Sequence, residues 1–324
     1  MKLFAVLTAA AIASLVSFTG ARADDFPSRP ISWVVGFAPG GISDQGARMV
    51  GKTFGEKLKQ SVVIENKPGA GGIVAAEYVA GSKPDGYTLY YGATGAMAAS
   101  VTLQKNLSYD PLKSFTLIHG FGTSALVLVV PANSPFKSLK ELIDYAKKNP
   151  GKLTYGSVGN GTASHLVAEL MSEHTGVKMT HVPYRGSSLG MTDLLGGRVD
   201  LMFDYSIVVK PQIEGGKLRA LAQTGAKRMV SHPDVPTFVD LGYPDVQFAA
   251  WATLVGPAGI PKPVVDKLAA AFNETLKDPA IIKYHDDQGV MLMPDMDGAK
   301  VREFYVKEIA KFKNLIERTG ASAN

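Results

Sequence analysis

The sequence predicts an α/β protein of two lobes, with two mostly parallel sheets and a ligand cleft between the lobes. Strand-like and helix-like segments alternate along the whole chain, which is typical of parallel sheets covered by helices. Two apolar runs, at residues 115–131 and 246–261, are long for single strands and indicate two crossings between lobes. The length of 324 residues also fits two domains better than one.

The N-terminal segment has the pattern of an export leader. Lys2 precedes an apolar stretch over residues 3–18, and a small-x-small cleavage site follows at residues 21–23. The apolar stretch is shorter than the roughly 18 residues that a membrane span needs, so we do not expect an anchor. We expect residues 1–23 to be removed and the mature protein to be soluble in the periplasm.

The composition excludes several classes of protein. The chain has no cysteine, so we expect no disulfide, no thiolate chemistry and no lipidated cysteine. Removal of Lys2 and Arg22 lowers the formal net charge from +5 to +3, and the basic residues are scattered. Nucleic acid is therefore not an expected partner.

Each lobe is expected to be a series of strand–turn–helix units, with glycine and proline marking the turns and helix ends. The first lobe, residues 24–123, has predicted strands at 31–37, 61–66 and 83–92 and helices at 43–59 and 73–80. The second lobe, residues 124–249, has predicted strands at 152–158, 179–184, 199–204 and 218–225 and helices at 138–151, 164–176 and 189–197. Residues 250–324 return to the first lobe, with helices at 262–278, 280–289 and 296–320.

Three of these units place glycines between strand and helix, at residues 36–44, 156–165 and 184–188. The first turn of a helix has N–H groups without partners, and the helix dipole adds partial positive charge there. Glycine lets a ligand approach this backbone closely. Because such turns meet at the carboxyl edge of a parallel sheet, they predict a binding site for an oxyanion.

The oxyanion is expected to be a carboxylate. Neither the dinucleotide-binding nor the P-loop glycine motif occurs, and Asp44 in the first turn would repel a phosphate. The side-chain donors available in these turns are Ser43, Ser157, Asn160, Thr162 and Ser164.

Four segments of the sequence resemble those of a known family. The segments "PSRPISWVVGFAPGGISDQGAR", "VVIENKPGAGGIVAAEYVAGSKPDGYTL", "SVGNGTASHL" and "HVPYRGSSLGMTDLLGGRVDLMFD" are similar, in this order, to the solute-binding proteins of tripartite tricarboxylate transporters, the Bug receptors. The resemblance covers essentially the whole mature chain. It implies a two-lobe, type II-like periplasmic receptor, monomeric, that closes on a small organic acid and presents it to membrane permease subunits.

The resemblance also implies which residues hold the ligand. In this family two strand–helix turns from opposite lobes, together with ordered water, hold one carboxylate. The matching positions are Phe37, Gly40, Gly41 and Asp44 in one turn, and Ser157, Gly159, Asn160, Thr162, Ala163 and His165 in the other. Further candidates near these turns are Tyr91, Thr94, Met97, Tyr184, Arg185 and Asp204.

The rest of the pocket decides which acid binds. Six apolar side chains form either a wall of the pocket, which would suit an aromatic acid, or part of the core: Met97, Phe37, Tyr91, Phe203, Tyr205 and Trp251. Arg185 is suited to a second carboxylate or to a structural role. Asp204 would favour an amino group on the ligand, or brace the loop after its strand.

Two other classes compete with a receptor. Ser134 and Lys137 match S-x-x-K without its companion motifs, and His165 near Ser157 resembles a Ser–His pair, so a serine hydrolase is one alternative. His165 and Glu169 share a helix face, but two ligands do not make a metal site. We expect no catalytic residue, metal or cofactor.

The sequence therefore predicts a receptor for a small organic carboxylate, either aromatic or dicarboxylic. The alternatives within the same fold are a receptor for an amino acid or a nicotinate-type acid, or one that serves a sensor kinase.

Overall fold

The computed structural model describes residues 26–319, so the predicted leader lies outside the described residues. Its strands are β1 (Ile31–Val35), β2 (Val62–Asn66), β3 (Thr88–Ala93), β4 (Phe115–Pro131), β5 (Thr154–Ser157), β6 (Thr180–Pro183), β7 (Leu201–Tyr205), β8 (Leu218–Gln223), β9 (Ala249–Pro257) and β10 (Val290–Leu292). They form one path in the order β2-β1-β3-β9-β4-β7-β5-β6, and β8 and β10 also pair with β4.

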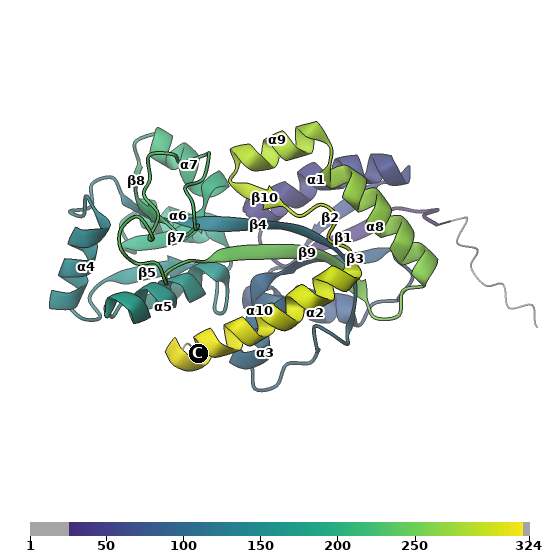
Figure 1. Cartoon of the computed structure of the whole chain (residues 1–324), viewed down its shortest axis with the longest axis horizontal. Coiled ribbons are helices and arrows are strands. Elements are labelled where there is room, and N and C mark those ends of the chain that lie inside the picture. The colour runs from purple at the N-terminus through teal and green to yellow at the C-terminus, as the bar shows by residue number, and fades with distance from the viewer. Residues whose placement is uncertain (1–25, 320–324) are drawn as a thin grey trace, which may run out of the picture.

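Helices cover this sheet system on several sides (Figure 1). They are α1 (Ile42–Leu58), α2 (Ile73–Ala80), α3 (Ser100–Leu103), α4 (Leu139–Lys148), α5 (Ala163–Thr175), α6 (Ser187–Leu195), α7 (Ser206–Glu214), α8 (Lys262–Leu276), α9 (Pro279–Asp287) and α10 (Gly298–Thr319). A short 3-10 turn, η2 (Ala70–Gly72), precedes α2, and a π-helical turn, η3 (Gly95–Ala99), precedes α3. None of the helices within residues 26–319 is long and apolar enough to cross a bilayer.

The long apolar run at residues 115–131 is one continuous strand, β4, shared by two groups of strands. Its first part, up to Ala125, pairs with β9 and β10, and its second part, from Leu126, pairs with β7 and with β8. Figure 1 shows β4 and β9 running side by side through the middle of the molecule. The two-lobe α/β class is confirmed, whereas the boundaries at residues 123 and 249 stay a prediction.

The sheets are more mixed than the sequence pattern predicts. The ladders β1–β2, β1–β3, β5–β6 and β5–β7 are parallel, but every ladder that involves β4 or β9 is antiparallel. The expectation of two mostly parallel sheets is therefore wrong at the centre of the molecule. The physical reason is that β4 leaves one group of strands and β9 runs back beside it in the opposite direction.

The sequence also missed two short elements. The stretch from Ser206 to Glu214 is a helix although it contains Pro211, and Val290–Leu292 forms a short strand. Pro211 lies past the first turn, so this helix of 9 residues lacks the backbone hydrogen bond that an N–H at position 211 would donate.

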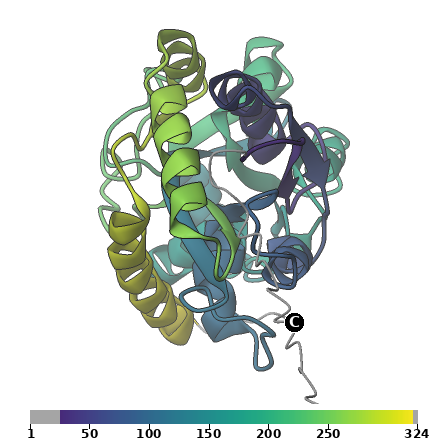
Figure 2. The same ribbon diagram turned by 90° about the vertical axis from the view of Figure 1, so that its right-hand side faces the viewer.

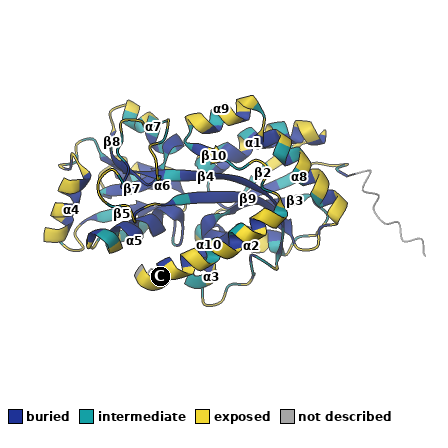
Figure 3. Ribbon diagram, in the orientation of Figure 1, coloured by how far each residue is buried: buried dark blue, intermediate teal, exposed yellow. Residues whose placement is uncertain are grey.

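The C-terminal segment returns to the first group of strands through α8. Its buried residues follow a four-residue spacing, which puts one apolar stripe against the sheet: Val264, Leu268, Phe272 and Leu276. Phe272 is fully buried and packs edge-on against Trp33 of β1 at 5.7 Å and against Phe54 of α1 at 5.2 Å. Figure 2 shows α8 in front of the sheet with α10 beside it, and Figure 3 shows that the strands are buried while the outer faces of the helices are exposed.

Replacing Phe272 by alanine tests this packing. We expect Phe272→Ala to lower the free energy of unfolding by about 3–5 kcal/mol, because the lost ring leaves a cavity between rigid neighbours. Equilibrium denaturation in urea measures the change. Val306→Ala, at a position 54% exposed in α10, is the control and should stay within about 0.5 kcal/mol of the parent protein. A loss below about 1 kcal/mol for Phe272→Ala would contradict the packing described.

Candidate ligand-binding site

One cavity lies where the strand–helix turns of both groups of strands meet. Its volume is about 70 Å³. Because one water molecule needs about 10–15 Å³, the cavity holds on the order of five water-sized groups. The β1–α1, β5–α5 and β6–α6 turns line it together with parts of β4, β9 and α9. The space fits a small molecule.

Four helices begin at this cavity. The residues that precede their first turns all line it: Gly41 for α1, Thr162 for α5, Gly186 for α6 and Tyr205 for α7. None of these four residues caps its helix with a side-chain hydrogen bond. The N–H groups and the partial positive charge of four helix N-termini therefore converge on one space.

The cavity wall carries no full charge. Among the residues of the described chain that line it, none is Lys, Arg, Asp or Glu. Aromatic rings make up much of the wall: Phe37, Tyr91, Phe121, Tyr205, Trp251 and Tyr284. An anion that entered would be held by backbone dipoles in a largely apolar surrounding, where such interactions are strong.

Asp44 holds the β1–α1 turn in shape. Its carboxylate accepts hydrogen bonds from the backbone N–H of Gly40 at 3.0 Å and from the amide of Asn66 at 3.0 Å, and it pairs with Arg48 at 2.8 Å. Burial alone would raise the pKa of Asp44, but the hydrogen bonds from Arg48, Gly40 and Asn66 outweigh burial and lower it. The carboxylate stays ionised and faces its own turn, outside the cavity lining.

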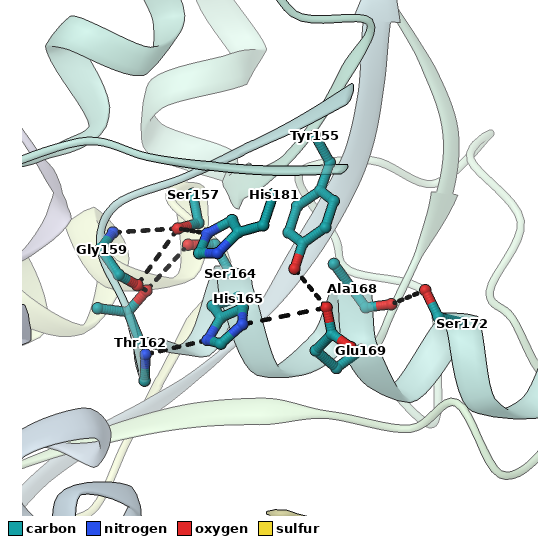
Figure 4. Close-up of polar contacts among 11 residues, drawn as sticks. Tyr155, Ser157, Gly159, Thr162, Ser164, His165, Ala168, Glu169, Ser172 and His181 are labelled. Carbon is teal, nitrogen blue, oxygen red and sulfur yellow. Dashed lines mark hydrogen bonds and ion pairs between the residues drawn. The ribbon is translucent and has the colours of Figure 1, made fainter. Parts of the chain in front are cut away.

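A second polar cluster supports the β5–α5 turn (Figure 4). The hydroxyl of Ser157 lies 2.6 Å from Nε2 of His181 and donates to the carbonyl of Gly159 at 3.2 Å. Nδ1 of His165 accepts from the backbone N–H of Gly161 at 3.0 Å. The histidine nearest to Ser157 is thus His181, and the Ser157–His165 pair of the hydrolase alternative is not formed.

The histidines of this cluster form a neutral stack. The rings of His165 and His181 lie 4.2 Å apart and 5° from parallel, and Tyr155 stacks on His181 at 4.8 Å. Burial lowers the pKa of His165 to about 3 and that of His181 to about 4. Two adjacent charged rings would repel each other, so the stack braces the turn as uncharged rings.

Asp204 lies behind the N-termini of α6 and α7. Its Oδ1 accepts from the hydroxyl of Ser187 at 3.0 Å and from the backbone N–H of Tyr205 at 2.8 Å, while its Oδ2 has no hydrogen-bond partner in the described protein. Burial raises the pKa of Asp204 to about 7. These contacts stabilise the backbone at the end of β7. A direct contact of Asp204 with a ligand stays a prediction.

The sixteen candidate residues fall into three groups. Six line the cavity: Phe37, Gly41, Tyr91, Thr94, Thr162 and Ala163. Four line an adjoining hollow that shares Phe37 and Val158 with the cavity: Gly159, Asn160, Tyr184 and Arg185. The remaining six line neither space: Gly40, Asp44, Met97, Ser157, His165 and Asp204. Their direct roles in binding stay predictions.

The expected apolar wall is partly core. Met97 is fully buried inside the main core cluster, and Phe203 stacks on Phe238 at 6.0 Å, whereas Tyr205 and Trp251 line the cavity. Sequence reasoning missed Tyr284, His285 and Gln288, which α9 and the turn after it contribute. No sequence signal marked them, because the segment has the pattern of an ordinary amphipathic helix far from the glycine turns.

Comparison with known proteins agrees with this geometry. Residues 46–321 match the family model described as tripartite tricarboxylate transporter family receptor. The structure of the periplasmic binding protein BugD has a TM-score of 0.88 and 34% identity, over 92% of this chain and 99% of that chain. MatC from Rhodopseudomonas palustris with bound malate has a TM-score of 0.85 and 32% identity, over 90% and 100% of the two chains.

A further R. palustris protein, solved with adipate, has a TM-score of 0.88 and 33% identity, over 92% of this chain and 99% of that chain. The family match spans most of the sequence, and the similar structures cover nearly the whole of both chains. The β5–α5 and β6–α6 turns lie within residues 46–321, and the β1–α1 turn lies just before them. The chain belongs to the family of tripartite tricarboxylate transporter receptors of the Bug type.

Proposed function

We propose that this protein is an exported, monomeric receptor that binds a small organic carboxylate and delivers it to the membrane permease subunits of a tripartite transporter. The observation that carries the proposal is the convergence of four helix N-termini on a cavity without charged side chains. Such a site binds an anion through neutral donors. The malate and adipate found in two similar structures support a carboxylate ligand.

The same geometry links binding to closure of the lobes. The β1–α1 turn belongs to the first group of strands, and the turns before α5, α6 and α7 belong to the second. The turns touch across the cavity, since a Cβ built on Gly186 would lie 3.2 Å from Cβ of Ala38. A carboxylate held by both sides has more partners in the closed form than in the open form, and this difference in binding free energy favours closure.

Of the other receptors considered from sequence, one for an amino acid fits less well. An amino acid would bring an ammonium group, and the cavity lining in the described chain offers no carboxylate to pair with it. A nicotinate-type acid brings the same carboxylate, so the cavity lining does not separate it from other acids. Delivery to a sensor kinase would use the same binding step and differs only in the partner of the closed form.

A ligand screen tests the proposal directly. At about 100 times its Kd, a ligand adds about 2.7 kcal/mol of stability, which raises the Tm by several degrees. We expect small carboxylic acids to raise the Tm of the dialysed protein and their amides to leave it unchanged. Equal shifts for an acid and its amide would contradict an anion site.

A variant of the first turn tests where the acid binds. Gly41 has an ordinary φ of -85°, and the nearest atom to an added Cβ is Oγ of Ser187 at 3.9 Å, so Gly41→Val fits the fold but fills space between the turns. We expect its affinity for the acid found in the screen to fall at least tenfold. Gly81→Val, at the end of α2 and outside the cavity lining, is the matched control. Unchanged binding by Gly41→Val would remove the first turn from the site.

Binding should also depend on pH through Asp204. A carboxylate at the N-termini of α6 and α7 brings negative charge near this side chain, so the protonated form of Asp204 favours binding. Because its pKa is raised to about 7, protonation is lost and the affinity should fall as the pH rises from about 6 to about 8.

Calorimetric titration at several pH values measures this fall. Asp204→Asn keeps an acceptor for Ser187 but cannot ionise, so its affinity should change little over the same range. The exposed Asp234→Asn should behave as the parent protein does. A parent profile that is flat between pH 6 and pH 8 would contradict the coupling.

A further inference from the structure

Four hydroxyl groups of the cavity wall already use their protons within the protein. Thr94 donates to the carbonyl of Trp251 at 3.0 Å, and Ser124 donates to the carbonyl of Gly289 at 3.1 Å. Thr162 donates to the carbonyl of Gly159 at 2.7 Å, and Ser187 donates to the carboxylate of Asp204 at 3.0 Å. These side chains line the cavity, and they offer a ligand lone pairs but no proton. These four side chains thus favour a ligand group that donates.

His285 is the strongest such acceptor. It lies in α9, lines the cavity and is only 1% exposed. Its Nδ1 lies 2.8 Å from the carbonyl oxygen of Ile281, and since a carbonyl only accepts, Nδ1 carries the proton. Nε2 is fully buried and has no hydrogen-bond partner in the described protein. A buried polar atom of this kind usually has a partner, because leaving it unpaired costs free energy.

The ring is held in this orientation by its neighbours. Phe121 of β4 packs against it in a T-shaped arrangement at 5.6 Å, and Tyr284 does so at 5.1 Å. On the α1 side Nε2 faces Gly46, where an added Cβ would lie 3.7 Å from it. A side chain at this position would therefore be in van der Waals contact with Nε2 and, at 3.5 Å, with the ring of Phe121.

The charge state makes Nε2 an acceptor. Burial lowers the pKa of His285, which outweighs the opposing effects of its bond to Ile281 and of Asp286, so the ring is neutral at neutral pH. A second carboxylate on the ligand would bring lone pairs towards this lone pair. An ammonium group would find no carboxylate among the described residues that line the cavity. A hydroxyl group matches the site without either difficulty.

The position of His285 sets the distance between the carboxylate and the second polar group of the ligand. Gly46 lies one helical turn beyond Ile42, which corresponds to about 6 Å along the axis of α1. Both residues line the cavity, so Nε2 is about one turn away from the N-terminal N–H groups that would hold the carboxylate. That separation corresponds to a few covalent bonds in a small molecule.

We propose that the ligand is a small hydroxy acid, whose carboxylate is held by the helix N-termini and whose hydroxyl donates a hydrogen bond to Nε2 of His285. The proposal rests on the carboxylate-receptor function above and narrows its substrate class. His285 then determines specificity, because its Nε2 accepts a hydrogen bond from the ligand hydroxyl. An unsubstituted acid of the same length cannot make this bond.

Calorimetric titration with a matched set of four-carbon acids tests the proposal. The probes are butyrate, the 2-, 3- and 4-hydroxybutyrates, succinate and 4-aminobutyrate, titrated into the dialysed protein. We expect one hydroxybutyrate to bind at least about tenfold more tightly than butyrate, since a buried acceptor is paired only in that complex. In His285→Phe this ratio should fall towards one.

Two further variants separate specificity from folding. His232 is another buried histidine with an unpartnered Nε2, but it does not line the cavity, so His232→Phe should keep the ratio of the parent protein. Gly46→Ala favours helix α1 and places a methyl group in front of Nε2, so it should lower the ratio in a stably folded protein. The Tm of each variant reports its folding.

The outcomes distinguish the two proposals. If butyrate and the hydroxybutyrates bind equally, or if the ratio survives in both His285→Phe and Gly46→Ala, the role of His285 is overturned while the carboxylate site stands. Tightest binding of succinate or 4-aminobutyrate would also overturn the hydroxy-acid assignment. If none of the acids binds, and none of a wider acid panel does, both proposals fail.

Discussion

The continuity of β4 is the constraint on which the rest of the structure depends. A single strand of 17 residues serves two groups of strands, and β9 returns beside its first part. The backbone hydrogen bonds of both groups therefore share one support. Because the carboxyl ends of β1, β5 and β7 are fixed relative to this support, the helices that follow them start near one another, and their N-termini surround one cavity.

Backbone groups and side chains have different roles in the site. Backbone N–H groups supply the positive potential, while the charged and titratable groups nearest the turns are kept out of the cavity lining. Asp44 is held ionised by Gly40, Arg48 and Asn66, and burial keeps the stack of His165 on His181 neutral. The residues that line the cavity carry aromatic rings, aliphatic groups, hydroxyls, one amide and one neutral histidine. The positive potential thus comes from the backbone, while the side chains set the shape and polarity of the wall.

The sequence predicted the parts of this design that local patterns encode. Alternating segments and glycine turns predicted the α/β class, the crossing strand and three of the turns that line the cavity. The sequence did not predict the antiparallel centre, because pairing between β4 and β9 depends on contacts across more than a hundred residues. Nor did it predict His285, whose helix is brought to the cavity only by packing of the C-terminal segment. Met97 shows the converse: its position beside a glycine turn suggested a ligand contact, but the residue is fully buried in the core.

The C-terminal helix α10 has a mechanical consequence for the motion of the lobes. It packs against η3 and α3 beside the first group of strands and against α5 beside the second, and Arg318 reaches Glu173 of α5 at 3.4 Å. Phe312 also packs on Phe248, just before β9, at 5.8 Å. The helix therefore contacts both groups of strands. A rotation that separates the two groups of strands would have to pivot close to this helix or break its contacts.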